Sequence, residues 1–487
     1  MTDAPEPEYR IVVGLEVHAQ LRTRTKCFCA CAASGGDGPN SRTCPVCLGL
    51  PGALPVLSRA ALDLSVRAAV ALGCRIAERT WWDRKHYGYA DLPKGYQITQ
   101  HASPIGTDGL LRFEGADGPR EVRIQRVHLE EDTGRSIHDD ERTRLAFDRA
   151  GIALLEIVTE PDLRTSADVR ACLLAIRRLL RWIGVSDAEM EHGQMRCEPN
   201  VNVHIRCNAD TDTAWTPTPI AEIKNLNSIT AAARAVDYEV ARQLAEWNAT
   251  GTIGPGPRTT RGWSDAGQRT ELQRVKEEAA DYRFLPEPDL PVVTCAPELA
   301  EAARAAQSEL PDARRRRYID DLGLPAEVAD ELTQTLALSD WFERAAGAAD
   351  APRPVAAWIV GNRALVEAAI VHRRFSAKDL GKLVRAVERG RVPRAAARRI
   401  ILPEMARSGT KWHEIVAREG LEMADDAEVA AAVRATVDAH PDLVETARAG
   451  QSNVLEVLVG DVMRATRGRA DAAMVRTLVR GLVLGRP

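Results

Sequence analysis

The sequence predicts an α+β fold, with a mainly antiparallel sheet and some helices in residues 1–294 and only helices after them. Three observations predict it. The first part contains alternating runs typical of half-buried strands, which are joined by turns and irregular loops more often than by regular crossover helices. After residue 295 the strand pattern ends, and Ala, Arg, Leu and Glu dominate. The stiff Pro286–Pro291 segment lies between the two patterns and predicts a domain edge.

The chain is long enough for more than two domains. At 487 residues it has room for two to four domains, if a typical domain has ~150 residues. Gly and Pro interrupt the helical part at ordinary helix lengths, and a break is expected near residue 410. We therefore expect a first domain of residues 1–294, a helical domain of residues 295–410 and a helical tail domain of residues 411–487.

The most regular strand is expected at Tyr9–Leu21, where the side chains alternate without a break. One face would carry only apolar residues, and the other would carry Gly14, Glu16, His18 and Gln20. A carboxylate and an imidazole two residues apart on one face can meet one Mg²⁺ or one phosphate. A merely solvated pair on a half-exposed strand is the alternative, and the strand alone leaves it open.

Two helices are expected inside the first domain. The first spans Arg59–Leu72, with Ser58 as its N-cap, and the second spans Ser166–Ile183, with apolar residues at helical spacing. The N-terminus has no basic region followed by an apolar run, and no apolar stretch approaches the roughly 20 residues that span a bilayer. A cytoplasmic protein without a membrane partner is the expectation.

The overall charge does not indicate a general nucleic-acid binder. The formal net charge is −4, so an RNA partner would need a local basic patch. Residues Arg373–Arg407 contain eleven Lys and Arg against three acids. This stretch is either such a patch or a solvated helical face.

The strongest local motif is a cysteine cluster. Cys29-x-Cys31 is followed, after twelve residues, by Cys44-x-x-Cys47. Four thiolates in two close pairs suit a tetrahedral zinc ion, and a filled shell of four would make that zinc structural. Its binding free energy can be of order 10 kcal/mol, enough to fix a Gly-rich loop. Cys27 leaves the choice of ligands slightly ambiguous, and four unconnected cysteines are the alternative.

Two further stretches suggest a phosphate-binding site. Trp82–Gln97 interleaves lysines and an arginine with tyrosines, which suits a nucleotide or the end of an RNA. Val127–Arg135 places three acids after a strand, and such oxygen ligands suit Mg²⁺. If Glu130 and Glu131 continue that strand they face opposite ways, so only one can join Glu16 and His18. A plain solvated turn is the alternative.

Several common motifs are absent from the sequence. There is no GxxxxGK[ST] loop, no GxGxxG between a strand and a helix, and no GxSxG or Ser-rich amidase signature. If ATP is used, a Walker loop does not hold it.

Taken together, these segments closely resemble the B subunit of the bacterial and organellar aspartyl/glutamyl-tRNA amidotransferases. The resemblance covers almost the whole chain. Its segments, in order, are VGLEVHAQL, CFCAC with CPVCLGLPGALPVL, DRKHYGYADLPKGYQITQ, RVHLEEDTGRSIH, DRAGIALLEIVTEPD, GVSDAEMEHGQMRCEPN, EIKNLNS, KEEAADYRFLPEPDL and SNVLEVLVGDVMRATRGRAD.

The resemblance implies a reaction. In that family the B subunit uses Mg-ATP to phosphorylate the side-chain carboxylate of Glu or Asp on a mischarged tRNA, and ammonia then displaces the phosphate. An amidase-family glutaminase subunit supplies the ammonia, and a small third subunit completes a heterotrimer. Two alternatives stay open: the same ATP chemistry on another aminoacyl-tRNA, or a non-catalytic, zinc-stabilised tRNA-binding protein.

The resemblance also implies residue roles. Glu16, His18 and Glu131 would form the catalytic Mg²⁺ site. Lys85, Lys94 and Tyr87 would bind ATP. The zinc ligands would be Cys29, Cys31, Cys44 and Cys47, and the helical part would contact the tRNA body.

The chain also departs from the family pattern. YFYPDLP becomes YGYADLP from Tyr87, RCDAN becomes Arg196–Asn200 with Glu198 and Pro199, and QETR becomes RTTR at Arg258–Arg261. Gln273 replaces a methionine, and RYFPEPD reads RFLPEPD from Arg283. These departures motivate the hypothesis of a divergent member with an altered substrate or weakened activity.

Overall fold

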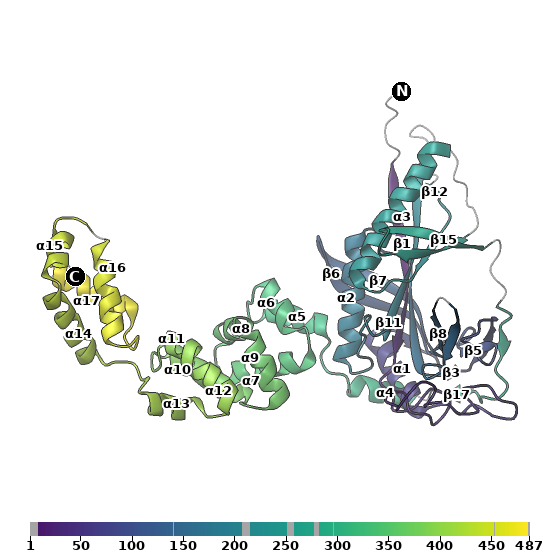
Figure 1. The fold of residues 1–487 in the computed structure, drawn as a ribbon, viewed down its shortest axis with the longest axis horizontal. Coiled ribbons are helices and arrows are strands. Elements are labelled where there is room, and N and C mark those ends of the chain that lie inside the picture. The colour runs from purple at the N-terminus through teal and green to yellow at the C-terminus, as the bar shows by residue number, and fades with distance from the viewer. Residues whose placement is uncertain are drawn as a thin grey trace. The chain divides into compact units, whose positions relative to one another are not determined.

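The computed structural model describes residues 8–139, 141–206, 215–250, 258–276, 282–295, 297–451 and 453–485 (Figure 1). The chain forms two compact units, residues 1–312 and 313–487, and each is described by itself. The predicted α+β class is confirmed, with the sheets in the first unit and helices in the second.

The first unit is built on a ten-stranded sheet. Its strand order is β15-β14-β13-β11-β1-β10-β7-β6-β2, and β12 pairs with β11. Within the described residues its pairs are antiparallel except β13 with β14. The strands are β1 (Tyr9–Gln20), β2 (Arg75–Ile76), β6 (Gly106–Gly115), β7 (Gly118–Glu131), β10 (Ala153–Thr159), β11 (Met195–Arg206), β12 (Trp215–Pro217), β13 (Ala221–Lys224), β14 (Arg258–Ser264) and β15 (Arg269–Lys276).

The predicted first strand is confirmed as β1, at the middle of this sheet. It pairs with β10 on one side and β11 on the other. Val13, Leu15, Val17 and Ala19 are almost fully buried, as the alternation predicts. The opposite face presents Glu16 and His18.

Three helices pack against the sheet. Helix α1 (Arg59–Ala71) packs on β6 and β7, α2 (Ser166–Trp182) on β6, and α3 (Ile229–Thr250) on β11 and β15. The two predicted helices are therefore confirmed, and the Ser58 hydroxyl accepts a hydrogen bond from Ala61 N as an N-cap. In Figure 1, α2 and α3 lie on one side of the large sheet and the strands β5 and β8 on the other.

Small sheets complete the first unit. They are β16-β4-β5 (Leu285–Pro286, Asp83–His86, Tyr96–Thr99), β17-β3 (Val293–Thr294, Arg79–Thr80) and β8-β9 (Arg135–His138, Thr143–Ala146). The predicted stiff segment is thus packed rather than free, because Pro286 pairs with Asp83 and the buried Glu287 accepts two hydrogen bonds from Arg84. This pairing places the residues near 285 beside the Trp82–Gln97 stretch.

The described residues from 297 onward contain helices and no strand, as the sequence predicts. One hydrophobic core extends from Tyr318 to Leu421 and another from Val429 to Val483. The domain limits expected at 294/295 and 410/411 stay predictions. The elements are α4 (Pro297–Ala305), α5 (Pro311–Asp320), α6 (Ala326–Leu332), α7 (Leu336–Ala349), α8 (Pro352–Val360), α9 (Arg363–His372), α10 (Ala377–Glu388), α11 (Arg394–Ala396), the π-helix η1 (Ala397–Ile401), α12 (Leu402–Ser408), α13 (Trp412–Glu419), α14 (Asp426–Ala439), α15 (Pro441–Arg448), α16 (Val454–Ala465) and α17 (Ala472–Leu484).

Among the described residues no single helix has the length and apolar composition needed to cross a membrane. Within the same residues, α8 and α9 meet the length and composition requirements only when taken together, and the two helices are bent by 92° relative to each other.

A close contact between α7 and α10 gives a stability test. A Cβ added at Gly381 would lie 2.3 Å from the Ala345 carbonyl oxygen and 2.8 Å from Ala348 Cβ. We expect Gly381→Ala to lower the free energy of unfolding by about 1–3 kcal/mol through overpacking. Gly347, inside α7, has open space around it, so Gly347→Ala is expected to raise stability by about 0.5–1 kcal/mol. Urea unfolding of the full chain measures both, and the reverse order of the two variants would contradict the packing.

Candidate functional site

A cavity of about 370 Å³ lies against the large sheet, on the face that carries His18. Side chains from β7, β10, β1, β11, β13 and β14 form its floor. Most of its lining is ionisable or aromatic. These side chains include Glu16, His18, Lys85, Tyr87, His101, Arg126, His128, Glu130, Glu156, Arg196, Glu198, Glu222, Lys224, Arg258, Tyr282 and Phe284.

Two imidazoles and two carboxylates meet at the centre of this cavity. His18, Glu156 and His128 are directly opposite one another on β1, β10 and β7. His18 Nε2 lies 3.2 Å from Glu156 Oε2 and 3.6 Å from Glu130 Oε1. His128 Nε2 lies 2.9 Å from Glu156 Oε2 and 3.6 Å from Glu130 Oε2. The two acids therefore share the same two histidines.

The charges of this cluster stabilise one another. Burial lowers the pKa of His18, but the Glu156 and Glu130 carboxylates outweigh it and raise the pKa to about 9. Burial likewise acts against the protonated form of His128, and the same acids raise its pKa. Burial raises the pKa of Glu156, but His128 and His18 outweigh it, so this pKa lies well below the usual range. Without a metal ion, the protonated histidines neutralise the acids.

The same groups fit a divalent cation. One donor atom each from His18, Glu130 and Glu156 lies within 4.8 Å of the others. Two carboxylates are the ligand number that Mg²⁺ usually takes from protein, with substrate phosphates and water completing its shell. A cation bound there would take the place of the proton on His18.

Glu16 lines the same cavity, two residues from His18. Its carboxylate accepts a hydrogen bond from Asn200 Nδ2 at 3.0 Å. Burial first, and then the acids Glu156, Glu198 and Glu222, raise its pKa. Glu16 therefore belongs to the cavity but not to the tight donor cluster around His18.

Glu131 does not meet Glu16 or His18, although the resemblance implied that it would. Strand alternation turns it away from Glu130, and its carboxylate forms an ion pair with Lys94 and accepts a hydrogen bond from Ile98 N at 3.0 Å. Lys94 and Glu131 line a second cavity of about 90 Å³, beside Cys29 and Cys47. The structure thus separates Glu131 and Lys94 from the main cavity, while Lys85 and Tyr87 line it.

Three cations in the main cavity have no carboxylate partner among the described residues. Lys85 Nζ lies 4.9 Å from the centre of the Tyr282 ring. Arg126 Nε is buried and makes no hydrogen bond to any described group. Among the described residues, the exposed Arg258 donates only to Asn200 Oδ1, at 3.0 Å. Lys85 and Arg126 are partly buried and lose hydration without an acidic partner, so this cavity suits an anionic ligand.

Aromatic rings form one wall of the cavity. His101 and Phe284 stack with ring centres 3.9 Å apart, and Tyr282 lies edge-on to both Phe284 and Tyr87 at 6.2 Å. Sequence reasoning missed His101, Tyr282 and Phe284 as site residues. The aromatic residues of the ADYRFLPEPDL segment were the available signal, but their neighbours lie almost 200 residues earlier.

The four expected zinc ligands do come together. One sulfur each from Cys29, Cys31, Cys44 and Cys47 lies within 4.8 Å of the others, and Cys27 is buried outside this set. A hydrogen bond from the Cys29 thiol, together with the nearby Lys26, lowers the pKa of Cys47 to about 4. This cluster can bind zinc.

Lys26 supports that assignment. It is fully buried, and its Nζ donates to Cys47 Sγ at 3.6 Å and to the Phe147 carbonyl at 3.2 Å. A buried ammonium needs a compensating negative charge. Four thiolates around Zn²⁺ carry a net charge of −2 and would supply it.

Comparison with known proteins gives matches along both units. The model of the GatB/GatE catalytic domain matches residues 11–301, and that of the GatB domain matches residues 340–483. The aspartyl/glutamyl-tRNA(Asn/Gln) amidotransferase B subunit of Treponema pallidum is 42% identical over 482 residues, which cover 97% of this chain and 94% of that protein. The corresponding protein of Carboxydothermus hydrogenoformans is 39% identical (97% and 98%), and that of Myxococcus xanthus is 40% identical (98% and 99%).

The cysteine cluster predicts the metal content. We expect the purified chain to contain about one zinc ion and Cys44→Ser to lose it, because three thiolates hold zinc far more weakly than four. Cys74, a buried thiol outside the cluster, provides the control: Cys74→Ser is expected to keep the zinc. Elemental analysis after dialysis measures both, and equal zinc content in the two variants would contradict the assignment.

His18 predicts a pH-dependent stability. Its pKa rises from 6.5 in the unfolded chain to about 9 in the folded one. The protonated form therefore stabilises the fold fully below pH 6.5, and this contribution disappears as the pH rises through 9. Relative to His18→Gln, the wild type should lose up to ~3 kcal/mol of unfolding free energy over that range. Urea unfolding in magnesium-free buffer at pH 6 and pH 9.5 measures it; a difference between the two proteins that is the same at both pH values would refute the coupling.

Proposed function

The chain belongs to the family of aspartyl/glutamyl-tRNA(Asn/Gln) amidotransferase B subunits, ligases of protein biosynthesis, and on that basis we propose that it uses Mg²⁺ and ATP to phosphorylate the side-chain carboxylate of Glu-tRNA(Gln) or Asp-tRNA(Asn). One observation carries the proposal. In a single cavity, a cluster of metal donors at His18, Glu130 and Glu156 lies among cations that have no carboxylate partner in the described part of the chain.

The chemistry explains why ATP is needed. A carboxylate does not react with ammonia, because oxide is a poor leaving group. In the proposed first step, a carboxylate oxygen attacks the γ-phosphorus, the bond to the bridging oxygen breaks, and ADP leaves with that electron pair. In the second step, ammonia attacks the acyl carbon, inorganic phosphate leaves, and nitrogen loses a proton. A glutaminase subunit of the amidase family would supply ammonia, with a small third subunit completing a heterotrimer.

The residues of the cavity divide these tasks. Phosphoryl transfer needs mainly positioning and charge neutralisation. Lys85 and Arg126 are free to contact phosphate oxygens, and Tyr87, Tyr282 and Phe284 offer flat surfaces for the base. His18, Glu130 and Glu156 would hold Mg²⁺, which would neutralise phosphate charge there, and Glu16 lines the same cavity.

Glu131 receives a positioning role in this proposal. Its main-chain carbonyl accepts from Gln97 Nε2 at 2.8 Å, and its carboxylate accepts from Ile98 N. Thr99, two residues from Gln97 on β5, donates to Glu130 Oε2 at 3.0 Å. Glu131 and its ion pair with Lys94 thus hold β5 in the position from which Thr99 orients the metal-binding acid.

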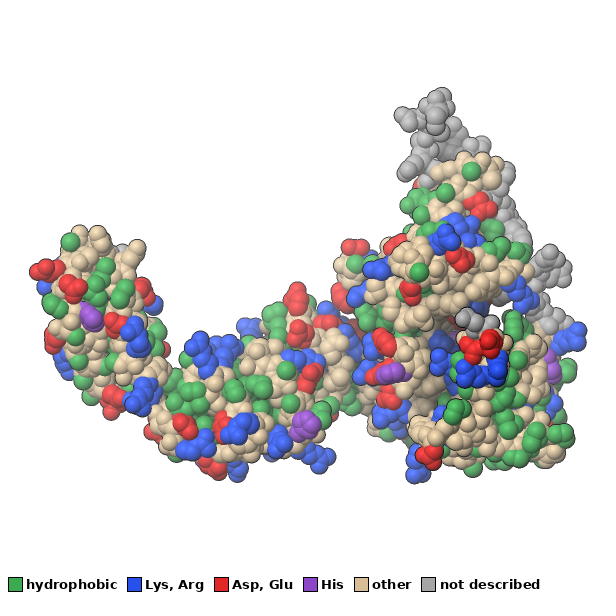
Figure 2. Space-filling view, in the orientation of Figure 1, with side chains coloured by type: hydrophobic (Ala, Val, Ile, Leu, Met, Phe, Trp, Pro, Cys, Tyr) green, Lys and Arg blue, Asp and Glu red, His purple; other side chains and the backbone are tan. Residues whose placement is uncertain are grey.

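The helical unit offers a surface for the tRNA body. Within Arg373–Arg407 most Lys and Arg side chains are exposed, and Figure 2 shows basic side chains on the surface over α10, α11 and α12. We propose that this region contacts tRNA phosphates.

Another aminoacyl-tRNA as the acceptor is the second candidate. Glu198 and Arg258, two of the departures from the family pattern, line the main cavity. The specific observation in favour of this candidate is that Arg258 adds a cation there with no acidic partner in the described part of the chain. A panel of charged tRNAs distinguishes the two acceptors. A non-catalytic tRNA-binding protein would release no ADP with any of them.

The placement of the acids predicts an order of mutational effects. Glu130→Gln removes a metal donor and is expected to slow single-turnover ADP release by about 100-fold in the complete complex with Glu-tRNA(Gln). Glu131→Gln removes no metal donor but breaks the ion pair with Lys94 that positions β5, and should cost about 10-fold. Glu121→Gln, exposed on β7 and paired with Arg112, is the control and should change nothing. Full activity of Glu130→Gln, or an inverted order of the two acids, would exclude this metal site.

A further inference from the structure

The main cavity has two chemically different ends. Its floor crosses β7, β10, β1, β11, β13 and β14 in that order, and neighbouring strands are ~4.8 Å apart, so the floor spans ~24 Å. Arg126 and the aromatic wall lie at the β7 end, and Arg258 begins β14 at the other. His18 lies between them, on β1. A nucleotide with its phosphates between Arg126 and His18 would leave the β14 end to the second substrate.

Arg258 is the residue at that end whose charge is available. Its guanidinium donates to Asn200 Oδ1, and Asn200 donates in turn to Glu16, each at 3.0 Å. Lys224, one strand away, is by contrast paired with Glu198 at 2.7 Å and Glu222 at 2.9 Å. Arg258 is exposed and has no acidic partner among the described residues, so its charge is available to a ligand, and it lies beside a polar chain that reaches Glu16.

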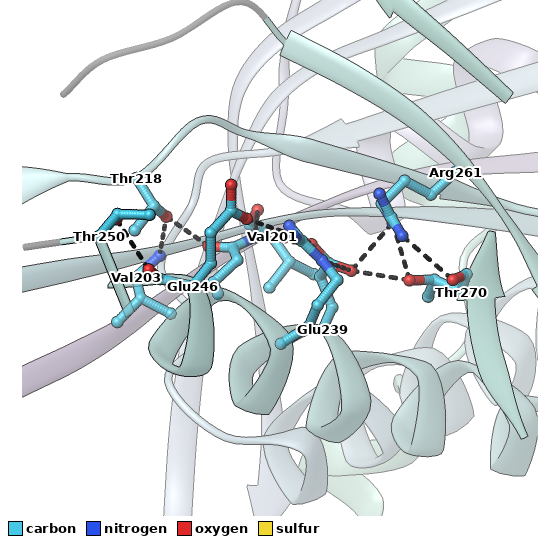
Figure 3. Close-up of polar contacts among 10 residues, drawn as sticks. Val201, Val203, Thr218, Glu239, Glu246, Thr250, Arg261 and Thr270 are labelled. Carbon is cyan, nitrogen blue, oxygen red and sulfur yellow. Dashed lines mark hydrogen bonds and ion pairs between the residues drawn. The ribbon is translucent and has the colours of Figure 1, made fainter. Parts of the chain in front are cut away.

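A buried network fixes the strand that carries Arg258. Glu239, on α3, is fully buried, and its carboxylate accepts from Thr270 Oγ1 at 2.9 Å and pairs with Arg261 Nε at 3.4 Å (Figure 3). Thr270 belongs to β15 and Arg261 to β14, three residues from Arg258. The Arg242 guanidinium also forms an ion pair with Glu239. One carboxylate thus ties both strands of the hairpin to the helix.

The same network fixes the strand that carries Asn200. Gln243, one turn along α3, donates to Glu239 at 3.0 Å and to the Val201 carbonyl at 3.2 Å. Gln243 also contacts Thr218, whose hydroxyl accepts from Val203 N at 2.8 Å (Figure 3). Val201 and Val203 belong to β11. Helix α3 therefore contacts both the strand of Arg258 and the strand of Asn200, and these contacts fix the distance between the two residues.

We propose that Arg258 binds a backbone phosphate of the single-stranded 3′ end of the charged tRNA, and that Glu239 is the positioning residue that holds it there. The proposal rests on the proposed function for the identity of the substrate. Replacing a buried ion pair by apolar residues is often neutral for stability, so a network of this kind is better explained by the geometry that it enforces.

The test measures binding rather than turnover. In the complete complex, we expect Arg258→Gln, which restores the amide of the family pattern, to weaken Glu-tRNA(Gln) binding about fivefold and leave ATP binding unchanged. The slope of the logarithm of the tRNA association constant against the logarithm of the salt concentration should become shallower by about 0.7, the value for one single-strand phosphate. Arg269→Gln is the matched control, since Arg269 is an exposed arginine on the same hairpin that pairs with Glu271 outside the cavity.

The network is tested through Thr270, because Glu239→Gln removes the acidic partner of Arg261, while Arg242 keeps Glu246, and can prevent folding. Thr270→Val removes the hydrogen bond to Glu239 and the one accepted from Arg261 Nε, and is expected to weaken tRNA binding about twofold in the wild type but not in the Arg258→Gln background. An equal loss in both backgrounds would mean a merely structural role and would overturn the positioning part of the proposal.

Two other results would overturn the assignment of Arg258: wild-type tRNA affinity in Arg258→Gln, or a loss of ATP affinity instead. Because neither measurement needs catalysis, failure of the wild type to release ADP would refute phosphorylation without affecting this test.

Discussion

Side-chain alternation on β1, β10 and β7 is the constraint on which the site depends. It places His18, Glu156 and His128 side by side, although they come from three distant parts of the chain. The opposite face of β1 is apolar and buried, so a slip of one residue would bury the charges and expose the core. The hydrophobic core therefore secures the register, and the register secures the contacts between the ionisable groups. A change in the strand register would therefore disrupt both the hydrophobic core and the contacts between the ionisable groups.

Features that depend on residues close in sequence could be predicted. The strand β1, the helices α1 and α2, the Ser58 cap and the change to an all-helical part follow from local periodicity, and the structure confirms them. The cysteine cluster was equally accessible, since its four thiols lie within nineteen residues and one loop brings them together. Such features need no knowledge of which strands pair.

Features that depend on strand pairing could not be predicted in the same way. Alternation showed that only one of Glu130 and Glu131 could face His18, but it could not say which. Glu156 lies in the apolar run ALLEIVT and resembles a core position until β10 is placed between β1 and β7. Lys94 resembled Lys85 in sequence, yet it is paired with Glu131. The aromatic wall needs β16 to pair with β4, an arrangement between residues just over 200 positions apart.

The parts of the main cavity differ in how freely they can change. In the middle of the cavity, around His18, removing one member of the cluster leaves a buried charge without its partner, which typically costs about 3–5 kcal/mol. Arg258, on β14, is exposed, and Glu198, on β11, is half-buried, so water can compensate a substitution at either position. The departures at Glu198 on β11, Arg258 on β14 and Phe284 in the aromatic wall all lie outside the donor cluster around His18, which is intact. Charge burial thus opposes variation within that cluster, while the less buried positions around it can change.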